Sequence, residues 1–222
     1  MEMLGRGVYS MAEAAAYARL PYPTVYSWFN PDAKSGREPL FQSDLPDIDG
    51  GMALSFLDLV DVLVAGHLRT KKLPLQRIRV WYRALQEQWK LSHPFCHQRL
   101  RLDTGTRELF LELEAAEGLS DFAEVLSGQQ YAKHVIEPFL SHIDYEEELA
   151  RAWRIHRGIV IDPAVSFGKP AIEGRGITTH VVYNEFTAND RDADFVARLY
   201  GIPRERVQDA VDFEEHYRKA AA

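Results

Sequence analysis

Hydrophobic positions in residues 9–29 recur at helical spacing, in two short blocks separated by a turn. Ser10 and Glu13 have the spacing of a helix-capping box, and the apolar positions behind them are Met11, Ala14, Ala15 and Ala18. Two prolines follow, of which Pro21 ends the first helix and Pro23 suits the first turn of a second one. The pattern therefore predicts two helices joined by a tight turn.

The second of these helices has a buried and an exposed face. Val25 and Trp28 face inward, which leaves four side chains outward: Tyr22, Thr24, Tyr26 and Ser27. This arrangement indicates a helix-turn-helix, whose second helix would lie in the major groove of DNA. The same residues also fit a helical hairpin that only packs.

The segment that follows, residues 30–52, is rich in Pro, Asp and Gly and predicts a loop or short β-hairpin, the wing that often follows a helix-turn-helix. Arg37 lies in it, placed to meet a backbone phosphate. Two longer helices come next, because Ser55 and Asp58 form a second capping box and Pro74 opens another helix. Three arginines outside the apolar seam of the latter predict an exposed basic face: Arg77, Arg79 and Arg83.

Residues 93–157 predict a connecting module of mixed structure. Alternating apolar positions in residues 100–113 indicate a β-hairpin around Gly105, since glycine supplies the left-handed turn position. Helices are expected in residues 119–143, and a strand is expected near residues 152–161. The sequence does not reveal a function for this module.

The C-terminal part begins with an unusual text, IDPAVSFGKPAIEGRGI, at residues 161–177. Its glycines and prolines predict a shaped loop with short extended pieces, and their spacing does not fit a phosphate-cradling P-loop. Three helices are expected near residues 179–187, 190–200 and 203–218, again with helix-turn-helix shape. The last one presents acidic residues, which favours protein over nucleic acid as its partner: Glu205, Asp209, Asp212, Glu214 and Glu215.

These elements predict an α+β fold class, mainly α with small β elements. We divide the chain into a winged helix-turn-helix domain (residues 1–92), the connecting module (93–157) and a C-terminal trihelical domain (158–222).

Charge separates the two halves of the 222-residue chain. The net charge of −7 divides into +2 for residues 1–110 and −9 for residues 111–222. Residues 66–101 contain nine Lys or Arg against one acidic residue, Glu87, and such a local field attracts phosphates. The alternative is a solvated basic face without a ligand.

Other features exclude several classes of protein. The chain has no apolar run of membrane-spanning length and no signal-type N-terminus, and its single cysteine, Cys96, cannot form an internal disulfide. We therefore expect a cytoplasmic protein without a membrane association.

Candidate catalytic and metal-binding groups are sparse. Asp58 and Asp61 are expected on a helix surface, without basic or histidine neighbours. His93, Cys96 and His97 lie close enough in sequence to suggest a metal but lack a fourth ligand. The expectation is no catalytic residue, no metal and no cofactor, and hence no enzyme.

The first 85 residues resemble the winged DNA-binding domain of MerR-type regulators. The matching texts are YSMAEAAAYARLPYPTVYSW, the wing and LSFLDLVDVLVAGHLRTKKLPLQRIR. Two differences limit the resemblance. Tyr26 stands where that family often has an arginine, and no long coiled coil with metal-binding cysteines follows.

The text IDPAVSFGKPAIEGRGI and its trihelical tail resemble the C-terminal domain of a bacterial antitoxin family catalogued as a domain of unknown function. With the N-terminal part, the layout is similar to VapB-like antitoxins with a MerR-like head. The common motif has an arginine directly before the isoleucine, where this chain has Gly176 and, one place earlier, Arg175.

The resemblance implies a type II antitoxin that binds a PIN or PIN-like RNase toxin and represses its own operon as a homodimer on double-stranded operator DNA. Expected DNA contacts are Tyr22, Thr24, Tyr26, Ser27, Arg37, Arg77 and Arg79. The expected toxin-binding region contains Phe167, Lys169 and Arg175. The alternatives are a stand-alone MerR-like transcriptional regulator with a C-terminal ligand- or protein-binding domain, and an adaptor that never touches DNA.

Overall fold

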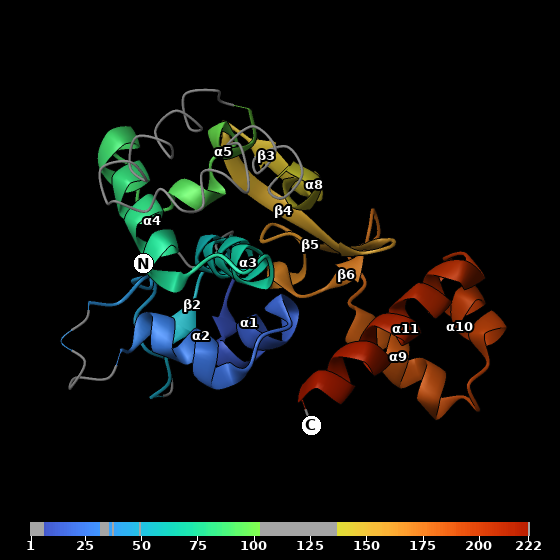
Figure 1. The fold of residues 1–222 in the computed structure, drawn as a ribbon. Coiled ribbons are helices and arrows are strands. Elements are labelled where there is room, and N and C mark those ends of the chain that lie inside the picture. Colours follow the sequence, from blue (N-terminus) through green and yellow to red (C-terminus); the bar gives the residue numbers. More distant parts are fainter. Residues whose placement is uncertain (1–6, 32–35, 37, 49, 103–136, 222) are drawn as a thin grey trace.

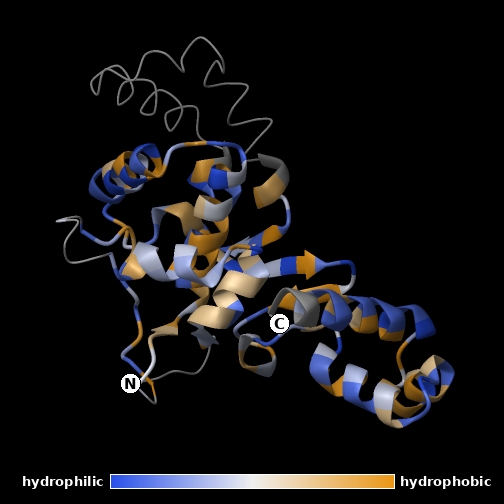
Figure 2. Ribbon diagram, turned by 60° about the horizontal axis from the view of Figure 1, so that its bottom comes forward, coloured by the Kyte–Doolittle hydropathy of each residue, from blue (hydrophilic) through white to orange (hydrophobic). Residues whose placement is uncertain are grey.

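The computed structural model describes residues 7–31, 36, 38–48, 50–102 and 137–221. It has an α+β fold, as predicted from the sequence, with helices α1–α4 around the N-terminal core and helices α9–α11 grouped at the far end (Figure 1). A four-stranded antiparallel sheet lies between these helical groups. Figure 2 shows hydrophobic and hydrophilic stretches alternating along the C-terminal helices, as expected for helices with one buried face.

The two short helices predicted in the first segment are present. Helix α1 spans Met11–Ala18 and α2 spans Tyr22–Phe29. The Glu13 backbone N–H donates to Ser10 Oγ at 3.2 Å, and the Ser10 N–H donates to the Glu13 carboxylate at 2.9 Å, so the capping box is confirmed. Strand β1 (Tyr9–Ser10) pairs antiparallel with β2 (Ala53–Leu54), which places this unit against the start of the next helix.

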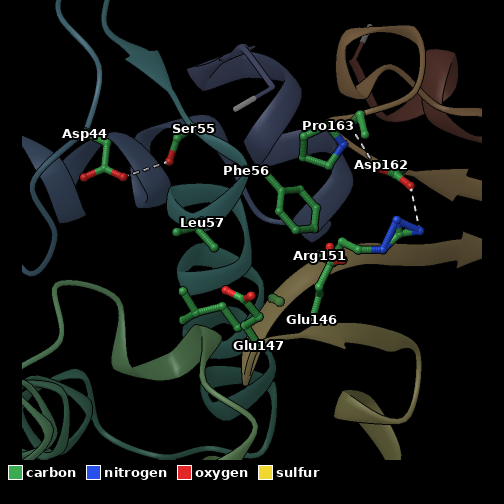
Figure 3. Close-up of a pocket in the computed structure, with 12 residues that line it drawn as sticks. Asp44, Ser55, Phe56, Leu57, Glu146, Glu147, Arg151, Asp162 and Pro163 are labelled. Atoms are coloured by element: carbon green, nitrogen blue, oxygen red, sulfur yellow. Dashed lines mark hydrogen bonds and ion pairs between the residues drawn. The ribbon is translucent and has the colours of Figure 1, made fainter. Parts of the chain in front are cut away.

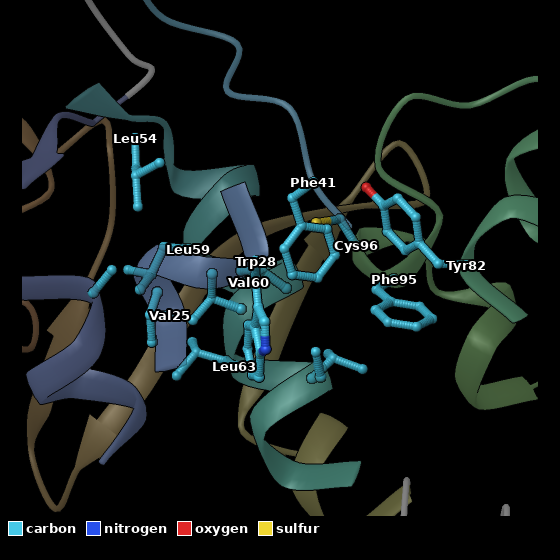
Figure 4. Packing of buried hydrophobic residues seen from close by; sticks show 14 of the residues in the cluster. Val25, Trp28, Phe41, Leu54, Leu59, Val60, Leu63, Tyr82, Phe95 and Cys96 are labelled. Atoms are coloured by element: carbon cyan, nitrogen blue, oxygen red, sulfur yellow. The ribbon is translucent and has the colours of Figure 1, made fainter. Parts of the chain in front are cut away.

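Helix α3 (Phe56–Thr70) occupies the centre of the N-terminal half, and α4 (Leu75–Trp89) packs beside it. The capping box of α3 is confirmed, since the Asp58 N–H donates to Ser55 Oγ at 3.1 Å. Residues of α2, α3 and α4 share one hydrophobic cluster, in which Val25, Trp28, Leu59 and Tyr82 are buried (Figure 4). Because α3 is buried on nearly every side, the prediction of a surface position for Asp58 and Asp61 is wrong: both are 1% exposed.

The segment after α2 forms a loop in its described part, residues 38–48 and 50–52, where the one strand-like contact is an isolated bridge between Ile48 and Gly51. The loop turns back over the core, because the Leu40 and Phe41 N–H groups donate to the Trp28 carbonyl at 2.7 and 3.2 Å. Of the two alternatives for the wing, the described residues fit the loop.

The prediction of a β-hairpin in residues 100–113 is wrong for its first residues. Residues Arg99–Leu102 form the short helix α5, which follows a 3-10 turn, η2 (Pro94–Cys96). Gly105 and the rest of the hairpin lie outside the described residues, as do the helices expected in residues 119–136. The chain is described again from α8 (Glu137–Leu140).

The sheet consists of β3 (Ile143–Glu146), β4 (Leu149–His156), β5 (Ile159–Ile161) and β6 (Ala171–Ile172), paired in that order. The strand predicted near residues 152–161 is confirmed as two strands and a turn. Glu147 and Glu148 in the β3–β4 turn both have positive φ angles, 48° and 70°, a conformation that usually selects Asn and Gly.

After a 3-10 turn, η5 (Ser166–Gly168), three helices end the chain: α9 (Thr179–Ala188), α10 (Ala193–Tyr200) and α11 (Arg204–Ala221). They agree with the three predicted helices. Gly201 ends α10 in the left-handed region at φ 61°, a common helix C-terminus. Their apolar faces meet in a second cluster that includes Val182, Val196, Val207 and Ala210.

The two clusters are joined through α1. The buried Tyr9 hydroxyl donates to the Gly168 carbonyl at 2.9 Å, and Lys169 Nζ lies 2.7 Å from Glu13 Oε1. The Tyr17 and Tyr217 rings meet edge to face with centroids 5.8 Å apart. The C-terminal helices are therefore fixed against α1.

Gly168 is the position at which this joint is most sensitive to substitution. Its φ is +77°, and a Cβ there would clash with the Tyr9 ring and hydroxyl. Gly168→Ala is expected to lower the free energy of unfolding by about 1–2 kcal/mol for backbone strain and by about 1–3 kcal/mol more for the clash. Chemical denaturation of the full chain measures this loss.

Gly174→Ala is the matched control, because Gly174 has φ +74° but open space around its Cβ position. The Gly174→Ala variant should lose only the part of the free energy of unfolding that is due to backbone strain. Equal losses in the two variants would show that the close approach of Gly168 to Tyr9 contributes nothing, and Tyr9→Phe should recover part of the Gly168→Ala loss if the hydroxyl causes the clash.

Candidate nucleic-acid interface and partner surfaces

Helix α2 presents an aromatic and hydroxyl-bearing surface. The exposed Tyr22 and Tyr26 rings stack with centroids 5.9 Å apart. The exposed Ser27 donates its hydroxyl to the Thr24 carbonyl at 2.8 Å, and Thr24 is half-buried. The helix carries no charged side chain, so this surface is suited to contacts with base edges and sugars more than with phosphates.

The basic face predicted on α4 is wrong at two of its three arginines. Arg77 is 4% exposed and Arg79 is 8% exposed. Arg79 donates to the backbone carbonyl of Glu38, and the exposed Arg83 forms an ion pair of 2.6 Å with the Glu38 carboxylate. The loop after α2 thus covers the flank of α4 that the helical pattern assigned to solvent.

Other cationic groups lie nearer the helix-turn-helix. Arg19, at the left-handed C-cap of α1, is exposed and lines the same hollow as Thr70 at the end of α3. The exposed Lys71 and Lys72 follow Thr70 directly. Sequence reasoning missed Arg19, although its place in the turn between the helices was a usable signal. Arg37 lies outside the described residues.

The C-terminal loop exposes one large aromatic residue. Phe167 is 72% exposed and, like its neighbour Ser166, has a positive φ, 56° and 49° respectively. Ser166 donates its hydroxyl to the Gly176 carbonyl at 2.5 Å, which holds the turn. An exposed phenylalanine in a strained backbone conformation is typical of a binding site.

The other two residues expected to bind a partner differ in their availability. Arg175 is exposed, whereas Lys169 is engaged by Glu13 of α1. Burial would raise the pKa of Glu13, but the hydrogen bonds from Lys169 and from the Ser10 N–H outweigh it and lower that pKa. Lys169 therefore fixes the joint between the two clusters.

A hollow of about 620 Å³ opens between the N-terminus of α3 and the β3–β4 turn (Figure 3). Phe56 and Pro163 form part of its wall, and Glu146 and Glu147 lie at its edge. Its cationic side chain, Arg151, pairs with Asp162 at 3.2 Å. The remaining charges are acidic, so this hollow would repel nucleic acid.

A buried polar cluster lies between α3, α4 and η2. His93 Nδ1 is 2.8 Å from Asp61 Oδ2, which also accepts from the Tyr82 hydroxyl at 2.6 Å. Cys96 Sγ is 3.6 Å from Asp61 Oδ1, and His93 Nε2 is 2.9 Å from Asp44 Oδ2. The ligand atoms of Asp61, His93 and Cys96 all lie within 4.8 Å of one another.

Burial dominates the electrostatics of this cluster. It raises the pKa of Asp61, of Tyr82 and of the Cys96 thiol above their ordinary values. Burial would lower the pKa of His93, but hydrogen bonds and attraction from Asp61 and Asp44 outweigh it and raise that pKa to about 9. Sequence reasoning missed the cluster because it placed Asp61 on the surface.

Comparisons with known proteins identify distant relatives along most of the chain. The "Putative antitoxin VapB45" of Mycobacterium tuberculosis (strain ATCC 25618 / H37Rv) is 27% identical over 230 residues, which cover 92% of each chain. The "Uncharacterized protein Rv2308" of the same organism is 26% identical over 235 residues, 98% of this chain and 94% of that one. The family model "Protein of unknown function (DUF433)" matches residues 159–213. The chain is therefore similar, over most of its length, to a protein named as a putative antitoxin.

A solved structure supports the fold. The crystal structure of Rv2018 from Mycobacterium tuberculosis superposes with a TM-score of 0.68 at 24% identity, over 91% of this chain and 96% of that one. The DUF433 match runs from β5 into α11 and includes the loop with Phe167. Within the part of the chain that the structure describes, no helix combines the length and the hydropathy needed to cross a bilayer.

The burial of Arg77 predicts that its removal is a folding defect. Arg77→Ala should lower the free energy of unfolding by about 1–3 kcal/mol, because it removes a buried side chain and the packing of its aliphatic stem. Arg83→Ala, on the exposed side of the same helix, should cost less than about 1 kcal/mol. Denaturant titration of both variants measures the difference, and equal stabilities would place Arg77 at the surface.

Proposed function

We propose that this chain is the antitoxin of a type II toxin–antitoxin pair, which neutralises a PIN or PIN-like RNase toxin and represses its own operon. The observation that carries the proposal is the similarity to the "Putative antitoxin VapB45" over 92% of both chains. The DUF433 match in the C-terminal part, where the sequence resembles an antitoxin domain, supports it. The proposed activity is binding, without catalysis, in the cytoplasm.

DNA binding is assigned to residues 1–92. Helices α1 and α2 are short and joined by a tight turn, as a helix-turn-helix requires, and α2 exposes Tyr22 and Tyr26. Arg19, Lys71 and Lys72 supply positive charge at its edge, where phosphates of the groove would lie. One recognition helix reads few base pairs, so we propose a homodimer on a palindromic operator.

Toxin binding is assigned to residues 158–222. Phe167 and Arg175 are exposed on the loop after β5, and Glu205 and Asp212 are exposed on α11. Asp209, expected on the same acidic face, is instead buried and pairs with Arg206 at 2.9 Å. An acidic surface with an aromatic anchor suits a partner that handles RNA and is basic at its working surface.

The DNA assignment predicts a defect when Tyr26 is truncated. Tyr26→Ala should weaken binding to upstream operon DNA about tenfold, or about 1.4 kcal/mol, because an exposed contact is lost without a loss of core packing. A gel shift at low salt measures this, and wild-type binding should itself weaken steeply as salt rises.

Val181→Ala is the control, since Val181 is an exposed apolar residue on α9 of the other cluster. It should bind DNA like the wild type. Unchanged binding by a folded Tyr26→Ala variant would show that α2 does not contact the DNA. If the wild-type chain gives no gel shift at all, the chain would be an adaptor that does not bind DNA.

The toxin assignment predicts a defect when Phe167 is made polar. Phe167→Ser should weaken the complex with the product of the neighbouring reading frame by about 2 kcal/mol or more, as expected for a central aromatic anchor. It should also release nuclease activity in a mixture that the wild-type chain inhibits, while stability stays unchanged because Phe167 is exposed.

Leu199→Ser is the matched control, because Leu199 is exposed on α10 of the same helical group. Isothermal titration calorimetry of both variants separates a specific contact from general loss of apolar surface. A wild-type chain that forms no complex with any neighbouring product would instead favour the stand-alone regulator.

A further inference from the structure

We propose that Asp61, His93 and Cys96 bind one zinc ion in the core of the N-terminal half. The three residues come from α3 and from the turn η2 that packs against it. The proposal is independent of toxin and DNA binding. It concerns a metal site that the sequence alone did not predict, because Asp61 lies 32 residues before His93 along the chain.

The separations of the ligand atoms fit a metal. Zinc–oxygen and zinc–nitrogen bonds of about 2.0–2.1 Å and a zinc–sulfur bond of about 2.3 Å place tetrahedral ligand atoms roughly 3.3–3.6 Å apart. Cys96 Sγ and Asp61 Oδ1 are 3.6 Å apart, and His93 Nδ1 and Asp61 Oδ2 are 2.8 Å apart. A shift of about half an ångström between the carboxylate and the imidazole admits the ion.

The local charge also favours a cation. Three carboxylates, those of Asp44, Asp58 and Asp61, lie around the single imidazole of His93. Oδ1 of the buried Asp58 has no hydrogen-bond partner among the residues that the structure describes. Buried charge without a counter-charge is costly, so a divalent ion would offset the excess negative charge better than one imidazolium does.

The surroundings orient the ligands as in known zinc sites. A ligating histidine commonly donates its second ring N–H to a carboxylate. His93 Nε2 lies 2.9 Å from Asp44 Oδ2 but outside hydrogen-bond geometry, so a small rotation of the ring would complete this contact. The Tyr82 hydroxyl holds Asp61 Oδ2 at 2.6 Å, while Asp61 Oδ1 faces Cys96 Sγ.

A hollow lies beside the cluster on the side of His93. It has a volume of about 510 Å³ and is lined by Asp44, Tyr82 and His93 but not by Asp61 or Cys96, so an ion would enter past the His93 ring. Zinc would bind Cys96 as the thiolate and His93 as the neutral imidazole, and the protons that these two groups lose pass to solvent. The ion would tie α3 to η2 and, through Tyr82 and the Phe41 ring 5.0 Å from it, to the loop after α2.

Cobalt substitution tests the site directly, because Cys96 is the only cysteine of the chain. Titration of the reduced, metal-free full-length protein with Co²⁺ should give a thiolate-to-cobalt charge-transfer absorption that saturates at one ion per chain. Zn²⁺ should displace that absorption and raise the melting temperature. Cys96→Ser, which changes one buried atom, should abolish the absorption and the zinc-dependent rise.

Two further variants locate the ligands. His97→Asn is the matched control, since His97 is also buried beside Cys96 but faces Glu148 at 3.4 Å, and it should keep the site. Asp44→Asn, at the exposed rim, should keep one ion per chain with an affinity about 10–100-fold lower. Loss of the absorption in a folded His97→Asn variant would overturn the ligand assignment.

A folded, reduced wild-type protein that shows no charge-transfer absorption at saturating Co²⁺ would falsify the proposal. The cluster would then be a buried ion pair between His93 and its carboxylates. Titration of the thiol after unfolding confirms that Cys96 was reduced in such a sample. His93→Asn should also abolish the absorption, because it removes the nitrogen ligand. If this variant fails to fold, the Cys96→Ser result decides alone.

Discussion

The burial of α3 is the constraint on which the N-terminal half depends. A helix enclosed on nearly every side has to satisfy each polar group inside the protein, because water does not reach it. Asp58 satisfies one of its two oxygens, Oδ2, by accepting the Ser55 N–H at 2.8 Å, and Asp61 Oδ2 accepts from the Tyr82 hydroxyl. Through these two carboxylates, the loop after α2 and the turn η2 are held against the core. The position of α2 and of the loop that follows it thus depends on polar contacts as well as on apolar packing.

The second determinant is the contact of α1 with the C-terminal part. Tyr9 and Glu13 reach across to Gly168 and Lys169, which directly follow the exposed Phe167. The aromatic residue proposed to anchor a partner therefore adjoins the residues that hold the first helix of the proposed DNA-binding unit. In this arrangement one short segment fixes the relative orientation of the two proposed binding surfaces.

Local signals predicted much of this fold from the sequence. The two capping boxes, the proline before α2 and the glycine after α10 act within one helical turn, so the helices they delimit could be placed without tertiary information. The failures share a different cause. Arg79 was assigned to solvent because it lies outside the apolar seam of its helix, but it donates to the Glu38 carbonyl, which lies 41 residues away along the chain.

The same reasoning explains the polar cluster. A helical pattern shows which face of α3 is most apolar, but it cannot show that the opposite face is covered by a distant turn. Because η2 covers that face, His93, Cys96 and Tyr82 all contact Asp61. The carboxylate on α3 and the His–Cys segment, each a weak signal in the sequence, thus form one buried cluster. A carboxylate on an otherwise apolar helix therefore requires a partner from elsewhere in the chain, and His93 and Cys96 were the side chains with suitable chemistry.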